Sequence, residues 1–190
     1  SYAGSQGMHA RLVHMKGLTV HETSIIGGNE TDYYRVWMDD CVLEGSGPTD
    51  QVRFFTSSEW TGGIYATDCT SRSVDYPCLG FMLVRNVLVE NIGGDAIREP
   101  AGLVVNFEAR DIIGSADSHN DVLQFFDPWP RARFENVIIY GVRAVHNVDA
   151  QHIQVQPYGD VVLESFAFVN FLVRATGIGQ WANSSNHLLL

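Results

Sequence analysis

Three segments of the chain place a polar residue at the start of a short alternating pattern, and their spacing could build a reactive site. The segments are 95–98, 121–124 and 151–154, at intervals of 26 and 30 residues. If they are stacked strands, Asp95 and Asp121 lie one strand spacing apart, about 5 Å. Two carboxylates this close cannot both ionise freely, so they share a proton, raise one pKa or bind a cation. The spacing therefore predicts acid–base chemistry or cation binding.

Two residues before these positions, the same alignment gives Gly93, His119 and Asp149. His119 could then remove or deliver a proton, and Asp149 could orient its ring or stabilise its charge. Such a carboxyl pair suits a retaining glycosidase, whereas a bound cation suits a lyase that neutralises a sugar carboxylate. The cofactor is left unassigned, with calcium as the candidate. The competing interpretation is structural, because aspartate and histidine at a strand start also hydrogen-bond to the backbone of the adjacent corner.

A proline recurs at the following bend on four of the predicted turns, and aromatic residues accompany three of these prolines. Exposed aromatic faces along one edge could stack on sugar rings, and guanidinium groups could bind sugar carboxylates. The predicted substrate-binding residues are Tyr76, Arg98, Trp129, Arg131, Arg133 and Tyr158. Trp129 has an alternative role, in which it covers the end of the core under a long loop.

The elements that would hold these residues form a weak repeat of about seven rows. The rows begin at Met15, Met38, Ala66, Val84, Phe107, Phe134 and Leu163. Positions one, four and six of each row are apolar, with Arg110 and Ser71 as the exceptions. Position eight is glycine, serine or asparagine in every row except the first, where it is Glu22, and these residues tolerate the backbone angles of a corner. Period-two alternation of this kind predicts short strands.

The row spacing favours an all-β solenoid of about seven to eight turns. Rows that are 18 to 29 residues apart are too distant for hairpins, and no helix-length apolar stretch separates them. Successive turns would stack strand on strand in parallel, about 4.8 Å apart, and bury a column of side chains. A β-sandwich is the competing architecture, but it needs hairpin signals such as Asn-Gly or Asp-Gly, and the sequence contains neither.

We expect residues 1–190 to form a single domain whose two ends are open. The first row starts by Met15 without an amphipathic helix before it, and residues 187–190 read as a further row cut in mid-strand. Bare ends of a solenoid aggregate or continue, because they expose unpaired strands and core. The chain is therefore predicted to be a fragment of a longer coil. The missing turns could come from the same chain, from a cleaved neighbour or from a stacked subunit.

Composition limits the classes of partner. The 190 residues are 45% hydrophobic and carry 22 acidic against 12 basic side chains, for a net charge of -10. This charge opposes unassisted binding to nucleic acid or to an anionic membrane, so a polyanion would need a local arginine patch or bound cations. No run approaches the length of a membrane helix, and the first residues lack the features of a signal peptide. We therefore expect neither a nucleic-acid partner nor membrane insertion.

Cysteine usage argues against a zinc site. The three cysteines, Cys41, Cys69 and Cys78, show no paired metal-ligand spacing. Cys41 and Cys69 share position four of their rows, where they should stack as small buried apolar groups. A bridge between Cys69 and Cys78 is left open. The remaining histidines show no metal-site pattern, so no metal ligands are assigned.

Two rows, 84–92 and 134–142, resemble rungs of the right-handed parallel β-helix superfamily typified by pectate lyases and polygalacturonases. The resemblance covers nearly the whole chain and is specific for fold but not for activity. In enzymes of that superfamily, the substrate lies in a groove outside the coil, with carboxylates of neighbouring rungs at its centre. Asp95 and Asp121 match that placement in kind. The Asp-Asp pair and Gly-His-Gly of polygalacturonases and the calcium cluster of pectate lyases have no counterpart here.

Two functions follow from these observations. The first is a protein that acts on or binds an extracellular, acidic polysaccharide, as a lyase or glycosidase if it is an enzyme. The second is a structural or adhesive β-solenoid of the cell surface, which stacks with neighbouring subunits or chain segments. Both interpretations place the protein outside the cell or at its surface.

Overall fold

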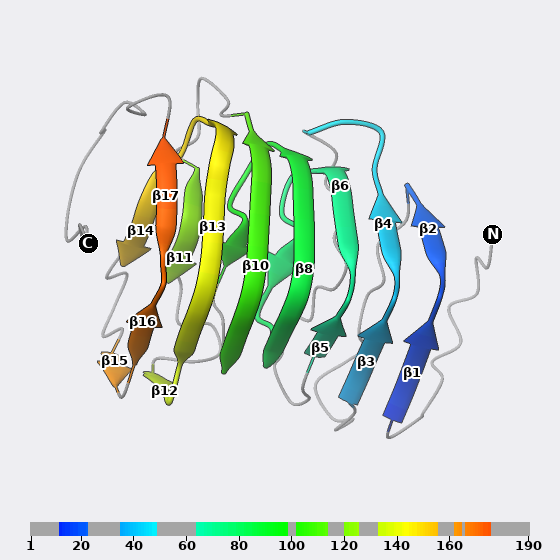
Figure 1. Ribbon diagram of the computed structural model, residues 1–190. Helices are drawn as coiled ribbons and strands as arrows, with labels where there is room; N and C mark the ends of the chain where they lie inside the picture. The colour runs from blue at the N-terminus through cyan, green and yellow to red at the C-terminus, as the bar shows by residue number, and fades with distance from the viewer. Residues whose placement is uncertain are drawn as a thin grey trace.

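The chain folds into parallel β-sheets (Figure 1). The computed structural model describes residues 12–22, 35–48, 64–98, 102–113, 120–125, 133–155, 162–164 and 166–175. Every regular element in these ranges is a β-strand, and all of the strand pairs are parallel. The prediction of an all-β chain with stacked parallel strands is therefore confirmed for the described residues.

The largest sheet has 11 strands. Its main path runs through β1 (Leu12–Lys16), β3 (Arg35–Asp39), β5 (Ile64–Thr67), β8 (Leu83–Ile92), β10 (Leu103–Ile112), β13 (Ile138–Val148) and β16 (Ala167–Val169). Four shorter strands continue the same rows: β2 (Thr19–His21), β4 (Val42–Glu44), β6 (Thr70–Val74) and β17 (Leu172–Ala175). The main path has seven strands, which agrees with the number of rows in the sequence repeat.

Two smaller parallel sheets complete the described structure. A four-stranded sheet contains β7 (Cys78–Leu79), β9 (Ile97–Arg98), β11 (Asp121–Phe125) and β14 (Gln151–Val155). A two-stranded sheet pairs β12 (Arg133–Glu135) with β15 (Val162–Glu164). In Figure 1, β11 and β14 lie behind the large sheet. Buried apolar residues of the large and four-stranded sheets belong to one core cluster.

The register of the first four rows is the one predicted, but the later rows are shifted. Met15, Met38, Ala66 and Val84 are successive partners. Val84 then pairs with Val104, and the same column continues through Ile139 and Phe168. The predicted row starts Phe107, Phe134 and Leu163 are therefore wrong. Phe107 lies in the fourth column between Val87 and Val142, while Phe134 and Leu163 are partners in the two-stranded sheet.

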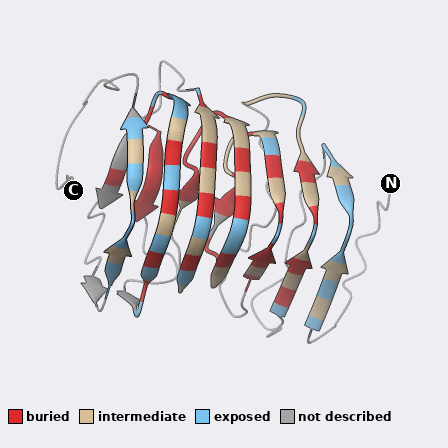
Figure 2. Ribbon diagram, viewed as in Figure 1, coloured by how far each residue is buried: buried red, intermediate tan, exposed pale blue. Residues whose placement is uncertain are grey.

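The physical reason for the shift of the fifth row is a ladder of left-handed residues at position three. The residues are Gly17, Asp40, Asp68, Asn86, Asn106, Gly141 and Asn170, with φ between 52° and 68°. Each one reverses the alternation, so positions one and four both face the core, as Figure 2 shows along β8 and β10. An offset of three residues, as between Val104 and Phe107, therefore preserves the apolar pattern. The sixth and seventh rows are displaced by five residues instead, because Phe134 and Leu163 belong to the two-stranded sheet that precedes β13 and β16. Amide side chains connect this ladder: Asn86 donates to Asp68 at 2.8 Å and Asn106 donates to Asn86 at 3.1 Å.

A second left-handed ladder lies at position eight, where the sequence predicted corners. It contains Glu22, Ser73, Asn91 and Asp111. Asn147 continues it one position later in its row, because the pairing of β10 with β13 shifts by one residue after Ala109. Glu22 adopts the corner conformation despite being the exception in the sequence pattern. Gly141 and Asn170 were assigned to this position, but they belong to the position-three ladder because their rows are shifted.

The cysteines are free thiols inside the core, and Cys69 is not bridged to Cys78. Cys41 and Cys69 are adjacent in one column, as predicted, because Val42 pairs with Thr70. Burial raises the pKa of Cys69 to about 11 and also raises that of Cys78. These thiols therefore stay protonated at mildly alkaline pH, and only the thiolate is a good nucleophile.

We expect iodoacetamide to leave all three cysteines of the native protein unmodified at mildly alkaline pH, because each is buried and at most 3% exposed. The same reagent should label all three after unfolding in denaturant, which serves as the control. Intact-mass spectrometry measures the number of labels. Rapid labelling of Cys69 in the native protein would contradict the buried column.

Candidate functional site

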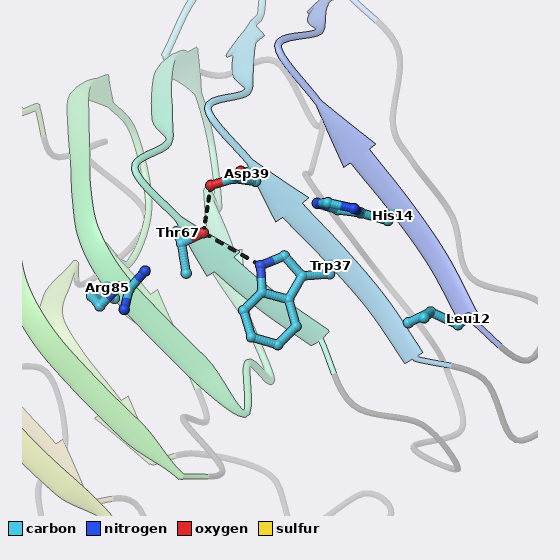
Figure 3. A pocket seen from close by; sticks show the side chains of 6 residues that line it. All are labelled: Leu12, His14, Trp37, Asp39, Thr67 and Arg85. Atoms are coloured by element: carbon cyan, nitrogen blue, oxygen red, sulfur yellow. Dashed lines mark hydrogen bonds between the residues drawn. The ribbon is translucent and has the colours of Figure 1, made fainter.

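The outer face of the large sheet carries a pocket at the end that contains β1. The pocket has a volume of about 410 Å³. It is lined by Leu12, His14, Trp37, Asp39, Thr67 and Arg85. Figure 3 shows these side chains on β1, β3, β5 and β8, where the alternation directs them away from the core. We call this feature the outer-face pocket.

A fixed aromatic surface lies in the outer-face pocket. Trp37 and Tyr65 are cross-strand partners, and their rings stack with centroids 5.1 Å apart and planes 6° from parallel. The indole Nε1 of Trp37 donates a hydrogen bond to the Thr67 hydroxyl at 3.4 Å (Figure 3). Stacking and this hydrogen bond hold the indole in one orientation, which leaves a preorganised flat surface for a ligand.

A charged group borders the aromatic surface. The Thr67 hydroxyl donates to Asp39 Oδ1 at 3.0 Å, and Lys16 Nζ lies 3.0 Å from Asp39 Oδ2. The hydrogen bonds from Lys16 and then from Thr67 lower the pKa of Asp39, and the hydrogen bond to Asp39 raises the pKa of Lys16. Asp39 is therefore an anion and Lys16 a cation over the whole neutral range.

Cations outnumber anions among the outward side chains of these strands. Lys16, Arg35 and Arg85 are exposed on this face, and the carboxylates of Asp39 and Glu90 also lie on it. Arg85 lies across Thr67 from Trp37 (Figure 3). Its guanidinium forms no ion pair or side-chain hydrogen bond with another described residue. Asp40 and Asp68 follow at the left-handed ladder, where Asp68 accepts a hydrogen bond from Asn86. In a chain with net charge -10, this face therefore carries three cations interspersed with carboxylates.

The predicted carboxylate site has the register that the sequence indicated. Ile97 pairs with Leu123 and Asp121 with Gln151, so the intervals of 26 and 30 residues are confirmed. The backbone N–H of Asp121 donates to Asp95 Oδ1 at 2.9 Å. The side-chain amide of Gln124 donates to Asp121 Oδ2 at 3.3 Å. The two aspartates therefore belong to one hydrogen-bonded corner.

Both aspartates of this corner are inaccessible from solvent. Asp95 is 2% exposed and Asp121 is 0% exposed. Their contacts agree with the structural interpretation, in which a carboxylate at a strand start accepts a hydrogen bond from neighbouring backbone. Their catalytic role stays a prediction.

Of the other predicted site residues, the structure brings Arg98 and Tyr76 into contact. The guanidinium carbon of Arg98 lies 5.4 Å from the ring centroid of Tyr76, which is a cation–π distance. Asp149 is exposed after the end of β13, and its N–H donates to the Ile112 carbonyl at 2.9 Å. Arg133 begins β12, but its side chain lies outside what the structure describes. The residues outside the described ranges are His119, Trp129, Arg131 and Tyr158.

The outer-face pocket was missed, although the sequence contained a signal for it. The residue that precedes the row start is His14, Trp37, Tyr65 and Leu83 in the first four rows, and the register of those rows was predicted correctly. Three ring-bearing residues therefore align in one outward column. The predicted site residues come from positions inside each row or after its corner, and the column just before the row start contributes none of them.

Comparisons with family models, with curated proteins and with solved structures found no match to this chain. The arrangement of the site therefore carries the functional argument. Within the described ranges, no group of three or more histidine, cysteine, aspartate or glutamate residues could hold a metal ion. The same residues include no helix with the length and apolarity to cross a membrane. The outer-face pocket offers instead a flat aromatic surface, an anion and cations, a set that binds polar ring compounds.

Proposed function

We propose that this protein is a right-handed parallel β-helix that binds an extracellular, acidic polysaccharide in the outer-face pocket. The observation that carries the proposal is the Trp37 ring, which is stacked on Tyr65 and held by Thr67 inside a pocket on an open sheet face. Sugar rings present apolar C–H faces that pack on such a surface, and their hydroxyl groups reach polar side chains beside it.

The order of the strands supports the helical coil. From β8 onward the chain alternates between the large sheet and the four-stranded sheet, and from β12 it also passes through the two-stranded sheet before it returns. Each return places a parallel strand beside the previous one, as in successive turns of a coil. A sandwich connected by hairpins would produce antiparallel neighbours instead.

The charges beside Trp37 support an acidic sugar as the ligand. Arg85 presents its guanidinium to the pocket, and guanidinium groups bind carboxylates or sulfates through paired hydrogen bonds. Lys16 forms an ion pair with Asp39, whereas Arg85 lines the pocket and forms no ion pair with another described residue, so a ligand can engage it without breaking one. Asp39 can accept hydrogen bonds from sugar hydroxyls, because its pKa is lowered and it stays ionised.

The test is the affinity of the chain for a panel of glycans. We expect Trp37→Ala to weaken binding to pectin, alginate or a glycosaminoglycan at least about tenfold, which corresponds to about 1.4 kcal/mol. Tyr140→Ala is the matched control, because Tyr140 is an exposed aromatic on the same sheet outside the pocket. Isothermal titration calorimetry measures both variants. Unchanged affinity in Trp37→Ala, or no binding across the panel, would refute the proposal.

Cleavage of an acidic polysaccharide is the second candidate function, with Asp95 and Asp121 as its residues because their strands have the predicted register. This function needs the polysaccharide to reach buried carboxylates at the four-stranded sheet, which is a different site from the outer-face pocket. The same glycan panel, with and without calcium, can be followed for unsaturated products by ultraviolet absorbance and for new reducing ends. Turnover that Asp121→Asn abolishes in a folded variant supports this function. Binding without products assigns the protein to a binding role.

A further inference from the structure

The two lateral edges of the large sheet expose residues that are buried in its middle. Among the described strands, β1 and β2 pair on one side only, with β3 and β4, and β16 and β17 pair only with β13 (Figure 1). Both edges therefore present strand backbone that no described strand covers. Such edges are templates for pairing with another parallel strand.

At the β1–β2 edge, four inward-facing apolar side chains are incompletely covered. Val13, Met15 and Val20 are only partly buried against the core, and Leu18 is 45% exposed. The next residue in the Leu18 column is Cys41, which is 3% exposed. Among the described residues, these side chains are exposed because no further strand pairs with β1 and β2, whereas the same column is buried one strand further in.

The opposite edge exposes an aromatic cluster. Phe166 is 45% exposed, and Phe168 and Phe171 are partly buried. The Phe166 and Phe168 rings lie 5.4 Å apart, and the Phe168 and Phe171 rings lie 6.3 Å apart. In the neighbouring strand the same columns hold Val137, Ile139 and Val142, which are buried. The aromatic side chains at this edge therefore occupy core-facing positions that no further described strand covers.

The two edges are complementary because the core-facing side chains of each edge lie at the two ends of the same side-chain columns. Met15 and Phe168 end one column, and the pairing between them passes through every main-path strand in parallel. Translation of a second copy along the stacking direction would therefore place its Phe168 beside Met15, with the strand direction already matched. An antiparallel partner or an unrelated surface would match neither the columns nor the strand polarity.

From this fit we infer that two copies of the chain associate head to tail, with the β16–β17 edge of one copy against the β1–β2 edge of the other. The contact joins different surfaces of the two copies, so it leaves a free edge at each end and can be repeated. The buried layer would contain Phe166, Phe168, Phe171 and Val173 from one copy and Val13, Met15, Leu18 and Val20 from the other.

The second copy would also complete the outer-face pocket. Leu12 and His14 of the edge strand β1 form one wall of that pocket, and Leu12 is 60% exposed. In the continued register, Ala167 and Val169 of the second copy extend the columns of His14 and Lys16. The added strand would cover the open side of the pocket. This consequence for ligand binding rests on the proposed function, whereas the association itself does not.

Two edge variants test the association by analytical ultracentrifugation. The unmodified chain should form species of twice its mass and above as its concentration rises. Leu18→Glu blocks the β1–β2 edge and Phe171→Glu blocks the opposite edge, so each variant alone should be monomeric. An equimolar mixture retains one compatible pair of edges and should form a dimer that does not grow further. Ile138→Glu is the control, since Ile138 is exposed on the outer face of β13, which is not an edge strand, and its substitution should leave association unchanged.

Three results with the unmodified chain and the two edge variants would overturn the inference. They are a monomeric chain at every concentration, self-association of either edge variant, and failure of the folded variants to pair when mixed. Circular dichroism and thermal unfolding of each variant establish that it is folded. Loss of association in Ile138→Glu would also overturn it, because contact would then occur through the sheet face.

A glycan measurement separates this inference from the proposed function. Phe171→Glu keeps its own pocket, and a partner with both Leu18→Glu and Trp37→Ala has an intact β16–β17 edge but no aromatic surface. Adding that partner should increase the glycan affinity of Phe171→Glu severalfold. If dimers form without this gain, the completed pocket is wrong and the association stands. If no glycan binds at all, the proposed function fails while ultracentrifugation still decides the association.

Discussion

Phe107→Ala should destabilise the protein by about 4 kcal/mol, because it removes a large buried side chain and leaves a cavity in a packed core. Phe107 is 1% exposed and lies between Val87 and Val142 in the fourth column of the large sheet. Neighbouring strands fix the backbone on both sides, so the site cannot collapse to fill the void. Equilibrium denaturation in urea, monitored by circular dichroism, measures the loss.

Leu103→Ala is the matched control for this prediction. Leu103 lies on the same strand, β10, but points outward and is partly exposed. Its truncation should cost less than about 1 kcal/mol, because little buried surface is lost. Equal effects of the two substitutions would mean that Phe107 does not lie in a buried core column.

Asp95→Ala should cost about 2 to 3 kcal/mol, because the buried N–H of Asp121 would lose its acceptor. That N–H donates to Asp95 Oδ1 at 2.9 Å, and both residues are shielded from water. A methyl group offers no acceptor, and water cannot replace the carboxylate without opening the corner. Urea denaturation of the two proteins measures the difference.

Asp95→Asn separates the structural role of this carboxylate from a chemical one. The asparagine side chain keeps an oxygen that can accept the hydrogen bond from Asp121, so most of the stability should return. A general acid or cation ligand at Asp95 would fail in both variants, even where the asparagine variant is stable. Stability that is equally low in both variants would mean that the negative charge, and not the acceptor oxygen, holds the corner.

The proposed binding site and the corner of Asp95 use different faces of the structure. The outer-face pocket lies on the large sheet, whereas β9 and β11 belong to the four-stranded sheet. A protein that only binds a polysaccharide needs the first site alone. The substitutions at Trp37 and Asp95 therefore report on separate properties, because one changes ligand affinity and the other changes folding.

The amino-acid sequence determined the class of fold and much of the register. Alternation with period two and the long spacing between rows predicted parallel strands without hairpins. All strand pairs among the described residues are parallel. The alignment of Asp95 with Asp121 and Gln151 was correct to the residue. These features are local or nearly periodic, because the identity of each side chain records whether it faces the core or the solvent.

Only the tertiary structure decided the register of the later rows and the position of the pocket. A left-handed residue such as Asn106 reverses the alternation, so two offsets bury equally apolar residues at Phe107 and Val104. Hydrogen bonding between whole strands selects one of them. The pocket likewise depends on contacts across strands, since the stacking of Trp37 on Tyr65 joins residues 28 positions apart. Sequence patterns record which face a residue occupies, whereas the neighbours that it meets on that face are set by how the strands pair.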